Sequence, residues 1–230
     1  MWNLIKDKLQ NIRENCGLRN HCKLMAQKTN IASQEYHEYL EMQITRSYFK
    51  RSNPFPEHSR ELINKIADTV EIGGLDVLCV GCRNLHEIKY LRDKSAKKVV
   101  GIDLYSEDSD ISVMDMHSMS FNDNSFDLVY SSHSLEHALD TLKAVSEFVR
   151  VVRDGGFIVI EVPVNYKTRG ADIVDFVSLG KLHNYFKDNL NKIVWSESVG
   201  TRDNDEENIT AIRTIMEIRK NNSRSQVDKS

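Results

Sequence analysis

Three segments carry side chains suited to holding a nucleoside, and each follows a short apolar run. Gly81 ends the first run, Asp103 ends the second, and Asp115 with Met116 follows the third. A glycine lets the backbone turn sharply against a ligand, and a carboxylate about 20 residues further on accepts hydrogen bonds from ribose hydroxyls. Asp103 lies 22 residues after Gly81. A second carboxylate beside an apolar side chain suits the amine and the face of a base, so the three segments together indicate a nucleoside-bearing cofactor.

A second group of residues, the segment 131–137, is rich in side chains that donate, accept or move protons. His133 and His137 are four residues apart, which places them on one face if the segment is helical. Histidine is the commonest general base because its ordinary pKa lies near neutral pH. The alternative for His137 is a structural role, with a hydrogen bond to the backbone that supports the turn.

The elements expected to position these residues form an alternation of strands and helices. Apolar runs are expected as strands at 76–80, 98–103, 111–114, 126–130 and 157–162, with crossover helices at 85–93 and 141–153. Parallel neighbours need such crossovers. Gly155 and Gly156 are expected to turn the second helix into its strand. The runs 192–198 and 209–219 have only a polar loop between them, which predicts an antiparallel hairpin at the sheet edge.

The region before the first strand is expected to be helical. Apolar spacing indicates helices near 2–12 and 31–48, a break at 53–56, and a third helix over 62–70 that Gly73 and Gly74 terminate. We therefore predict a helical region at 1–72, a core at 73–220 and a frayed polar tail at 221–230.

The composition limits the class of protein. The 230 residues are 40% hydrophobic and 28% charged, with 31 basic against 34 acidic residues and a net charge of −3. Such a chain has enough apolar residues for a core, and its charge does not favour nucleic acid as a partner. No apolar run approaches the roughly 20 residues of a membrane span. The start of the chain lacks a secretory signal pattern, so a cytoplasmic location is expected.

Six pieces of this chain, taken in order, resemble the class I S-adenosylmethionine-dependent methyltransferases, in particular the small-molecule group. The resemblance spans about residues 75–164. The matching pieces are Val77-Leu78-Cys79-Val80-Gly81-Cys82-Arg83-Asn84-Leu85, Val100-Gly101-Ile102-Asp103, Asp115-Met116, Asn124-Ser125-Phe126-Asp127-Leu128-Val129-Tyr130, Ser134-Leu135-Glu136-His137 and Val149-Arg150-Val151-Val152-Arg153-Asp154-Gly155-Gly156.

The resemblance implies a Rossmann-like α/β fold with a seven-stranded, mostly parallel sheet, an antiparallel edge strand and flanking helices. It implies S-adenosyl-L-methionine as the cofactor and methyl transfer as the reaction. It assigns cofactor binding to Gly81, Cys82, Arg83, Asp103, Leu104, Asp115, Met116, Ser131 and His133. It also places His137, together with His133, beside the methyl donor as the candidate catalytic residues.

The glycine turn departs from the family pattern. Cys79 replaces the usual acid, and Arg83 and Leu85 replace two further glycines. A guanidinium at Arg83 suits the carboxylate of the cofactor's methionine part, because arginine binds carboxylates bidentately. The alternative is that Arg83 points into solvent and the pocket has decayed. Cys79 and Cys82 form a C-x-x-C pair without a second pair at zinc spacing, so no metal is expected.

The expected acceptor is a polar small molecule or a sugar or glycan, methylated on oxygen or nitrogen. A basic stretch (Arg46, Lys50, Arg51, His58 and Arg60) and the polar segment 165–188 suit an acceptor with a phosphate or carboxylate. Two alternatives remain open. One is a non-catalytic binding or scaffold protein with this fold, and the other is an NAD-dependent oxidoreductase, which the missing second and third glycines disfavour. The oligomeric state is not predicted, and a homodimer is compatible with the sequence.

Overall fold

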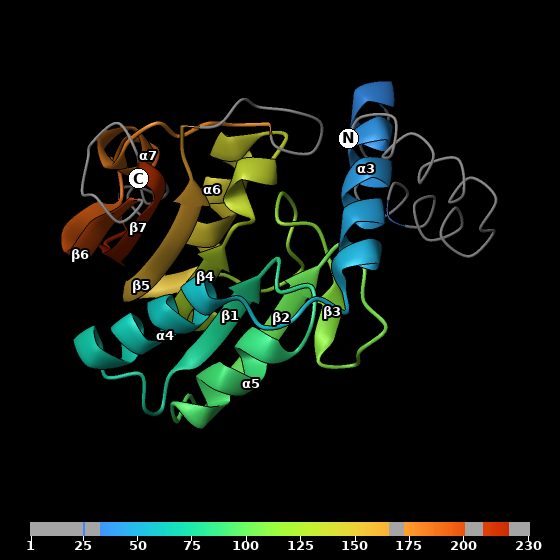
Figure 1. The fold of residues 1–230 in the computed structure, drawn as a ribbon. Coiled ribbons are helices and arrows are strands. Elements are labelled where there is room, and N and C mark those ends of the chain that lie inside the picture. Colours follow the sequence, from blue (N-terminus) through green and yellow to red (C-terminus); the bar gives the residue numbers. More distant parts are fainter. Residues whose placement is uncertain (1–24, 26–32, 166–172, 201–208, 221–230) are drawn as a thin grey trace, which may run out of the picture.

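A seven-stranded sheet forms the centre of the protein (Figure 1). The structure, a computed structural model, describes residue 25 and residues 33–165, 173–200 and 209–220. The strand order is β3-β2-β1-β4-β5-β7-β6, and only β7 runs antiparallel to its neighbours. The strands are β1 (Asp76–Val80), β2 (Lys98–Asp103), β3 (Ile111–Val113), β4 (Phe126–Ser132), β5 (Val152–Pro163), β6 (Leu190–Gly200) and β7 (Ile209–Ile218).

Helices cover both faces of the sheet, because each face presents a set of buried apolar side chains. The helices α4 (Glu57–Thr69) and α5 (His86–Asp93) pack on one face through Leu62, Ile66 and Leu91. The helices α6 (Thr141–Val151) and α7 (Leu179–Asn184) pack on the other face through Phe148 and Leu182. A short 3-10 turn, η1 (Leu135–His137), follows β4.

The predicted fold class is confirmed: the sheet is mostly parallel, with an antiparallel strand pair at one edge. Two local predictions are wrong. Gly155 and Gly156 do not precede their strand but lie inside β5, which begins directly after α6. There they meet a register irregularity against β4, and Gly155 has φ +73°. The helix α4 ends at Thr69, before the two glycines, because Val70 takes an extended conformation.

The helix α3 (Gln34–Lys50) stands beside the carboxyl ends of β2 and β3 (Figure 1). Ser33 caps it by accepting a hydrogen bond from the backbone N–H of Tyr36. Its buried face, with Tyr39, Leu40 and Ile44, packs against Leu104 just after β2. The helix thus covers the sheet edge at which ligands of open α/β sheets bind. The predicted helix near residues 2–12 and the tail at 221–230 lie outside the described residues.

The boundaries predicted at residues 72 and 220 stay predictions. The helix α4, on the first side of the proposed boundary, shares a hydrophobic core with β1 and α5. None of the helices in the described ranges has the length and apolar character that crossing a bilayer requires.

Candidate functional site

A hollow, here called the inner hollow, lies where β1, β2 and β4 end beneath α3. Its lining brings together Gly81, Asp103, Met116, His133 and His137. These residues are up to 56 positions apart in the chain. They meet because the carboxyl ends of parallel strands share one sheet edge. Leu104 and Arg83, also predicted from the sequence, line the same hollow.

The turn after β1 is fixed by a close contact with the turn after β4. Gly81 has φ +72°, and a Cβ placed on it would lie 2.4 Å from Ser134 Cβ. Ser134 in turn donates its hydroxyl to the Val80 carbonyl at 3.0 Å and lies 2.7 Å from Ser131 Oγ. The predicted cofactor residue Ser131 is fully buried and does not line the hollow. In this structure its hydroxyl stabilises the turn after β4 through the contact with Ser134.

Arg83 occupies a backbone conformation that normally favours glycine. Its φ is +52°, which explains why a glycine is the usual residue here, since a Cβ makes the left-handed region costly. Its side chain lines the inner hollow. Within the described residues its guanidinium makes no hydrogen bond or ion pair. The structure therefore places a cation at the mouth of the turn that is available to an anion.

Asp103 presents a buried carboxylate at the end of β2. Its two oxygens accept hydrogen bonds from the backbone N–H of Arg83 at 3.0 Å and of Tyr105 at 3.2 Å. The Ser47 hydroxyl of α3 also bonds to this carboxylate. Burial raises the pKa of Asp103, and these hydrogen bonds oppose the rise. The carboxylate is thus held rigidly at the floor of the inner hollow.

Asp115 and Met116 diverge, although they are adjacent in sequence. Met116 lines the inner hollow, whereas Asp115 borders a separate hollow beside Ser118 and Met119. The Asp115 carboxylate accepts hydrogen bonds from the Tyr36 hydroxyl and from the His117 backbone N–H at 2.9 Å, and His117 Nδ1 lies 2.6 Å away. Its role with a base stays a prediction, and in this structure it anchors α3.

A second hollow, here called the polar hollow, adjoins the first between α3, α4 and the turn after β1. It is lined by Arg46, Lys50, His58, Ser132 and Glu87, and it shares Gly81, Arg83, His133 and Arg46 with the inner hollow. Cys82 lines the polar hollow rather than the inner one, and its thiol lies 3.6 Å from the Ile102 carbonyl. Two of the basic residues predicted to face an anionic acceptor, Arg51 and Arg60, do not line either hollow.

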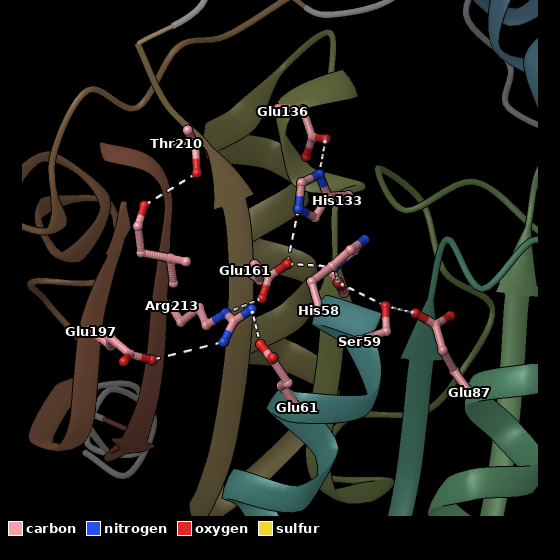
Figure 2. A network of polar contacts seen from close by, with 12 residues as sticks. His58, Ser59, Glu61, Glu87, His133, Glu136, Glu161, Glu197, Thr210 and Arg213 are labelled. Carbon is pink, nitrogen blue, oxygen red and sulfur yellow. Dashed lines mark hydrogen bonds and ion pairs between the residues drawn. The ribbon is translucent and has the colours of Figure 1, made fainter. Parts of the chain in front are cut away.

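A buried carboxylate on β5, Glu161, gathers two histidines at the back of the polar hollow (Figure 2). His58 Nδ1 of α4 lies 2.6 Å from Glu161 Oε1, and His133 Nε2 lies 2.9 Å from the same oxygen. The other oxygen, Oε2, contacts the Arg213 guanidinium of β7. Burial favours a raised pKa for Glu161, but the two histidines outweigh it and lower the pKa to about 2. This carboxylate is therefore ionised throughout the physiological range.

The two candidate catalytic histidines occupy different environments. The segment 133–137 is not a helix, because His133 has φ +49° and only the 3-10 turn follows it. His133 is 32% exposed at its side chain and lines both hollows. His137 lines only the inner hollow, with Nδ1 3.3 Å from Arg46 Nη1 and Nε2 3.4 Å from Glu136 Oε1. His133 is thus the one that reaches both spaces.

Glu87, at the start of α5, is a carboxyl group tuned close to neutral pH. Burial raises its pKa from the ordinary 4.5 to about 7, against the hydrogen bond that Ser59 donates to Oε1 at 2.9 Å. Nearby are the Tyr130 hydroxyl, 3.4 Å from Oε1, and the Cys79 thiol, 3.9 Å from Oε2. Arg83 and His58 also lower this pKa by their charge.

We expect stability to depend on pH through Glu87. In the folded chain it ionises near pH 7, but in the unfolded chain near 4.5, so its contribution is fully present below pH 4.5 and is lost as pH rises through 7. The loss is about 3 kcal/mol at 1.36 kcal/mol per pKa unit. Urea unfolding at pH 5 and pH 8 should show this decline in wild type and not in Glu87→Gln. An equal decline in Glu87→Gln would contradict the assignment, and Glu57→Gln, an exposed glutamate, is the control.

Sequence reasoning did not single out Glu87 or Glu161, and it treated His58 only as part of a basic stretch. Each lies in a segment with a simple structural explanation. Glu87 is at the start of a helix, Glu161 is in a buried strand, and His58 is in a helix that follows the proline break. The polar interruption of an otherwise apolar strand at Glu161 is the one signal that marks a special residue, since a charged group is rarely fully buried without a partner. Of the predicted segment 165–188, residues 166–172 lie outside the described part.

Comparison with known proteins gives a family-model match and solved structures with the same fold. Residues 78–160 match the family model described as a methyltransferase domain. Among the curated proteins, none matches this chain. Solved structures with the same fold include the 1,6-didemethyltoxoflavin-N1-methyltransferase of Burkholderia thailandensis, which holds 1,6-didemethyltoxoflavin and S-adenosylhomocysteine. It has a TM-score of 0.66 and 13% identity over 83% of this chain and 92% of that one.

Two further structures show the range of chemistry on this fold. The N-methyltransferase NodS of Bradyrhizobium japonicum, in complex with S-adenosylhomocysteine, has a TM-score of 0.57 and 16% identity over 77% of this chain and 99% of that one. The [4+2]-cyclase SpnF has a TM-score of 0.58 and 16% identity over 70% of this chain and 81% of that one. Likeness at this identity shows the fold, and the family-model match adds the domain type. The match over residues 78–160 and the shared fold together support a class I S-adenosylmethionine-dependent methyltransferase domain in this part of the chain, with S-adenosylmethionine as its cofactor.

Proposed function

We propose that this enzyme methylates a polar, anionic small molecule that binds in the polar hollow while the cofactor occupies the inner hollow. The observation that carries the proposal is the shared wall of the two hollows, which consists of Gly81, Arg83, His133 and Arg46. Because the two hollows adjoin at these residues, a methyl donor in the inner hollow and an acceptor in the polar hollow can be brought together without a movement of the sheet. Binding both partners in a fixed geometry is the main contribution that a protein makes to such a transfer.

The residues of the inner hollow fit S-adenosylmethionine. Asp103 offers a buried carboxylate to the ribose hydroxyls, and Arg83 offers a guanidinium to the carboxylate of the methionine part. Met114, Met116 and Leu104 give an apolar wall for the base. The cofactor supplies an activated methyl group on its sulfonium. The chain's own contribution is to hold both ends of it and to exclude water beneath α3.

We expect Asp103→Ala to weaken cofactor binding by about 1.5 to 3 kcal/mol, the scale of hydrogen bonds to a charged group. This corresponds to a rise of about 10- to 150-fold in the dissociation constant of S-adenosylhomocysteine, measured by calorimetry. The matched control is Asp93→Ala, which removes an exposed aspartate from the end of α5. If folded Asp103→Ala binds as tightly as wild type, the ribose assignment is wrong.

Arg83→Gly should have opposite effects on stability and on binding. Glycine relieves the left-handed strain at φ +52° and should stabilise the fold by about 1 kcal/mol. It also removes the guanidinium, so the affinity for S-adenosylhomocysteine should fall although the usual glycine of the family is restored. Urea unfolding and calorimetry on the same sample measure the two effects separately. Tighter binding by Arg83→Gly would show that Arg83 obstructs the turn, as expected of a decayed pocket.

The acceptor class follows from the cations around the polar hollow. Arg46 and Lys50 line it, in addition to the Arg83 assigned to the cofactor, and both are donors suited to a phosphate or carboxylate group. A small acceptor is also consistent with the net charge of −3, which gives nucleic acid no attractive field.

His133 is the side chain that we place against the acceptor. It lines both hollows, with Nε2 2.9 Å from Glu161 Oε1, whereas His137 lines only the inner hollow, with Nδ1 3.3 Å from Arg46 Nη1. Because a guanidinium only donates, the Nδ1 of His137 must accept from Arg46, which leaves its other nitrogen to carry the proton. His137 therefore holds the cofactor side of the site in shape, and His133 acts on the acceptor.

The test is transfer of a labelled methyl group from S-adenosylmethionine to a panel of phosphorylated sugars, hydroxy acids and their uncharged analogues. We expect S-adenosylhomocysteine to form with anionic members and much less with their uncharged counterparts. Lys50→Ala should raise KM for the anionic acceptor and leave cofactor affinity unchanged. Tight S-adenosylhomocysteine binding without any transfer would instead favour a non-catalytic cofactor-binding protein. Binding of NAD in preference would favour an oxidoreductase.

A further inference from the structure

We propose that His58, His133 and Glu161 form a binding site for one divalent transition-metal ion, with open coordination positions that face the polar hollow. His58 Nδ1, His133 Nε2 and a Glu161 carboxylate oxygen all lie within 4.8 Å of one another. They come from α4, from the turn after β4 and from β5, so only the folded chain assembles them. The proposed site would deepen the proposed function, but binding of the ion does not depend on it.

The three side chains are close enough together to become ligands of one ion with a small movement. Ligand atoms about 2.1 Å from a metal ion in tetrahedral geometry lie about 3.4 Å apart, so the side chains would have to separate by about 0.5 to 0.8 Å to admit the ion. His58 Nδ1 and His133 Nε2 lie 2.6 and 2.9 Å from Glu161 Oε1. The two imidazole rings are tilted by 51° with their centroids 4.3 Å apart, so both can turn a nitrogen toward one point (Figure 2).

The buried oxygen Oε1 of Glu161 is the feature that favours a metal site over a simple ion pair. Glu161 is fully buried, yet within the described residues no donor makes a hydrogen bond of acceptable geometry to its Oε1. The two histidine nitrogens lie 2.6 and 2.9 Å from this oxygen and are its nearest polar contacts in the part of the chain that the structure describes. A buried carboxylate oxygen without a donor is costly, and a cation placed between the three atoms satisfies it.

The surroundings complete the site. Arg213 Nε contacts the other oxygen of Glu161, and Arg213 Nη2 lies 3.0 Å from Glu61 Oε2. His133 Nδ1 lies 3.9 Å from Glu136 Oε1. Such outer contacts are usual for metal ligands, because they fix the ring and the carboxylate in position. The arginine also balances the charge of Glu161, which favours a labile site over a permanently filled one.

The donor set selects the class of ion. Two imidazoles and one carboxylate suit Zn²⁺, Co²⁺ or Fe²⁺, whereas Mg²⁺ and Ca²⁺ prefer all-oxygen sites. Three protein ligands leave positions for an exogenous oxygen, as in catalytic rather than structural sites. His58 and His133 line the polar hollow beside Arg46 and Lys50, so that oxygen would belong to the acceptor. An ion at this position lowers the pKa of an acceptor hydroxyl, which favours methylation on oxygen.

Cobalt binding by the full chain tests the site. Protein stripped with EDTA is titrated with Co²⁺, followed by its visible absorption, and with Zn²⁺ by calorimetry, in the absence of cofactor and acceptor. We expect one ion per chain, no competition by Mg²⁺, and a loss of affinity in His58→Ala beyond the roughly 10- to 100-fold cost of losing an outer contact. His37→Ala, which removes an exposed histidine of α3, is the control and should bind as wild type.

Two further measurements decide the details. Glu161→Gln should bind Co²⁺ as weakly as His58→Ala, with circular dichroism confirming that it is folded; if it is not, His58→Ala alone decides the ligand set. Acetohydroxamate should shift the cobalt spectrum, because it chelates at open positions. The site is overturned if no saturable binding occurs or if His58→Ala binds as wild type, and its open face is overturned if acetohydroxamate has no effect. These assays measure metal binding and not methyl transfer, so their outcome does not depend on whether the proposed acceptor is correct.

Discussion

Replacing His133 with alanine should lower turnover by about 10²- to 10⁴-fold, the range typical of losing a positioned acid or base. The reason is its position, since its side chain lines both hollows and contacts Glu161 at 2.9 Å. The measurement is the rate of S-adenosylhomocysteine release at saturating cofactor and acceptor, together with cofactor affinity by calorimetry. The fall in turnover should be far larger than any change in affinity.

His137→Ala is the comparison for this prediction. Because its ring nitrogens face Arg46 and Glu136, we expect a loss of stability and of cofactor affinity, with turnover of the folded fraction close to normal. The reverse pattern, a large rate loss in His137→Ala and a small one in His133→Ala, would transfer the catalytic role to His137. If both variants keep normal turnover, the reaction proceeds by positioning alone.

Gly81→Ala should destabilise the folded protein by about 2 to 5 kcal/mol, because it combines a left-handed backbone with overpacking. The added Cβ would lie 2.4 Å from Ser134 Cβ, close to the backbone of the neighbouring turn rather than at a flexible end. Both turns border the inner hollow, so cofactor affinity should fall with stability. Urea unfolding gives the first quantity, and calorimetry with S-adenosylhomocysteine gives the second.

Gly155→Ala separates the cost of the left-handed backbone from the cost of overpacking. Gly155 has φ +73°, almost the same as Gly81, but a Cβ there would meet nothing within 4 Å. We expect the Gly155→Ala variant to lose about 1 to 2 kcal/mol of unfolding free energy, the cost of the left-handed backbone alone, with cofactor binding unchanged. Equal losses in the two variants would mean that the contact with Ser134 does not constrain the turn.

The predicted carboxyl ends of the five parallel strands before the hairpin agree with the structure to within two residues, because each rests on a local rule. Apolar runs of four to six residues, alternating with helical segments, leave few alternatives to a parallel sheet, and the carboxyl ends of parallel strands meet at one edge. Gly81, Asp103 and Met116 therefore line one hollow. The error at Gly155 and Gly156 has a local cause too. Glycine pairs usually mark turns, and only the register irregularity between β4 and β5 accommodates them inside a strand.

The amino-acid sequence by itself determined the parallel alternation of strands and helices with a hairpin at the sheet edge, the turn at Gly81 and the carboxylate at Asp103, since these depend on periodicity and on spacing along the chain. Only the tertiary structure decided that Glu161 meets His58 and His133, that Glu87 has a pKa of about 7, and that Asp115 binds Tyr36. The reason is that contacts of high sequence separation, and the burial that shifts a pKa, depend on which elements pack together. The pairing of β5 with β4, and the packing of α3 and α4 on the sheet, create those environments, and no local pattern encodes them.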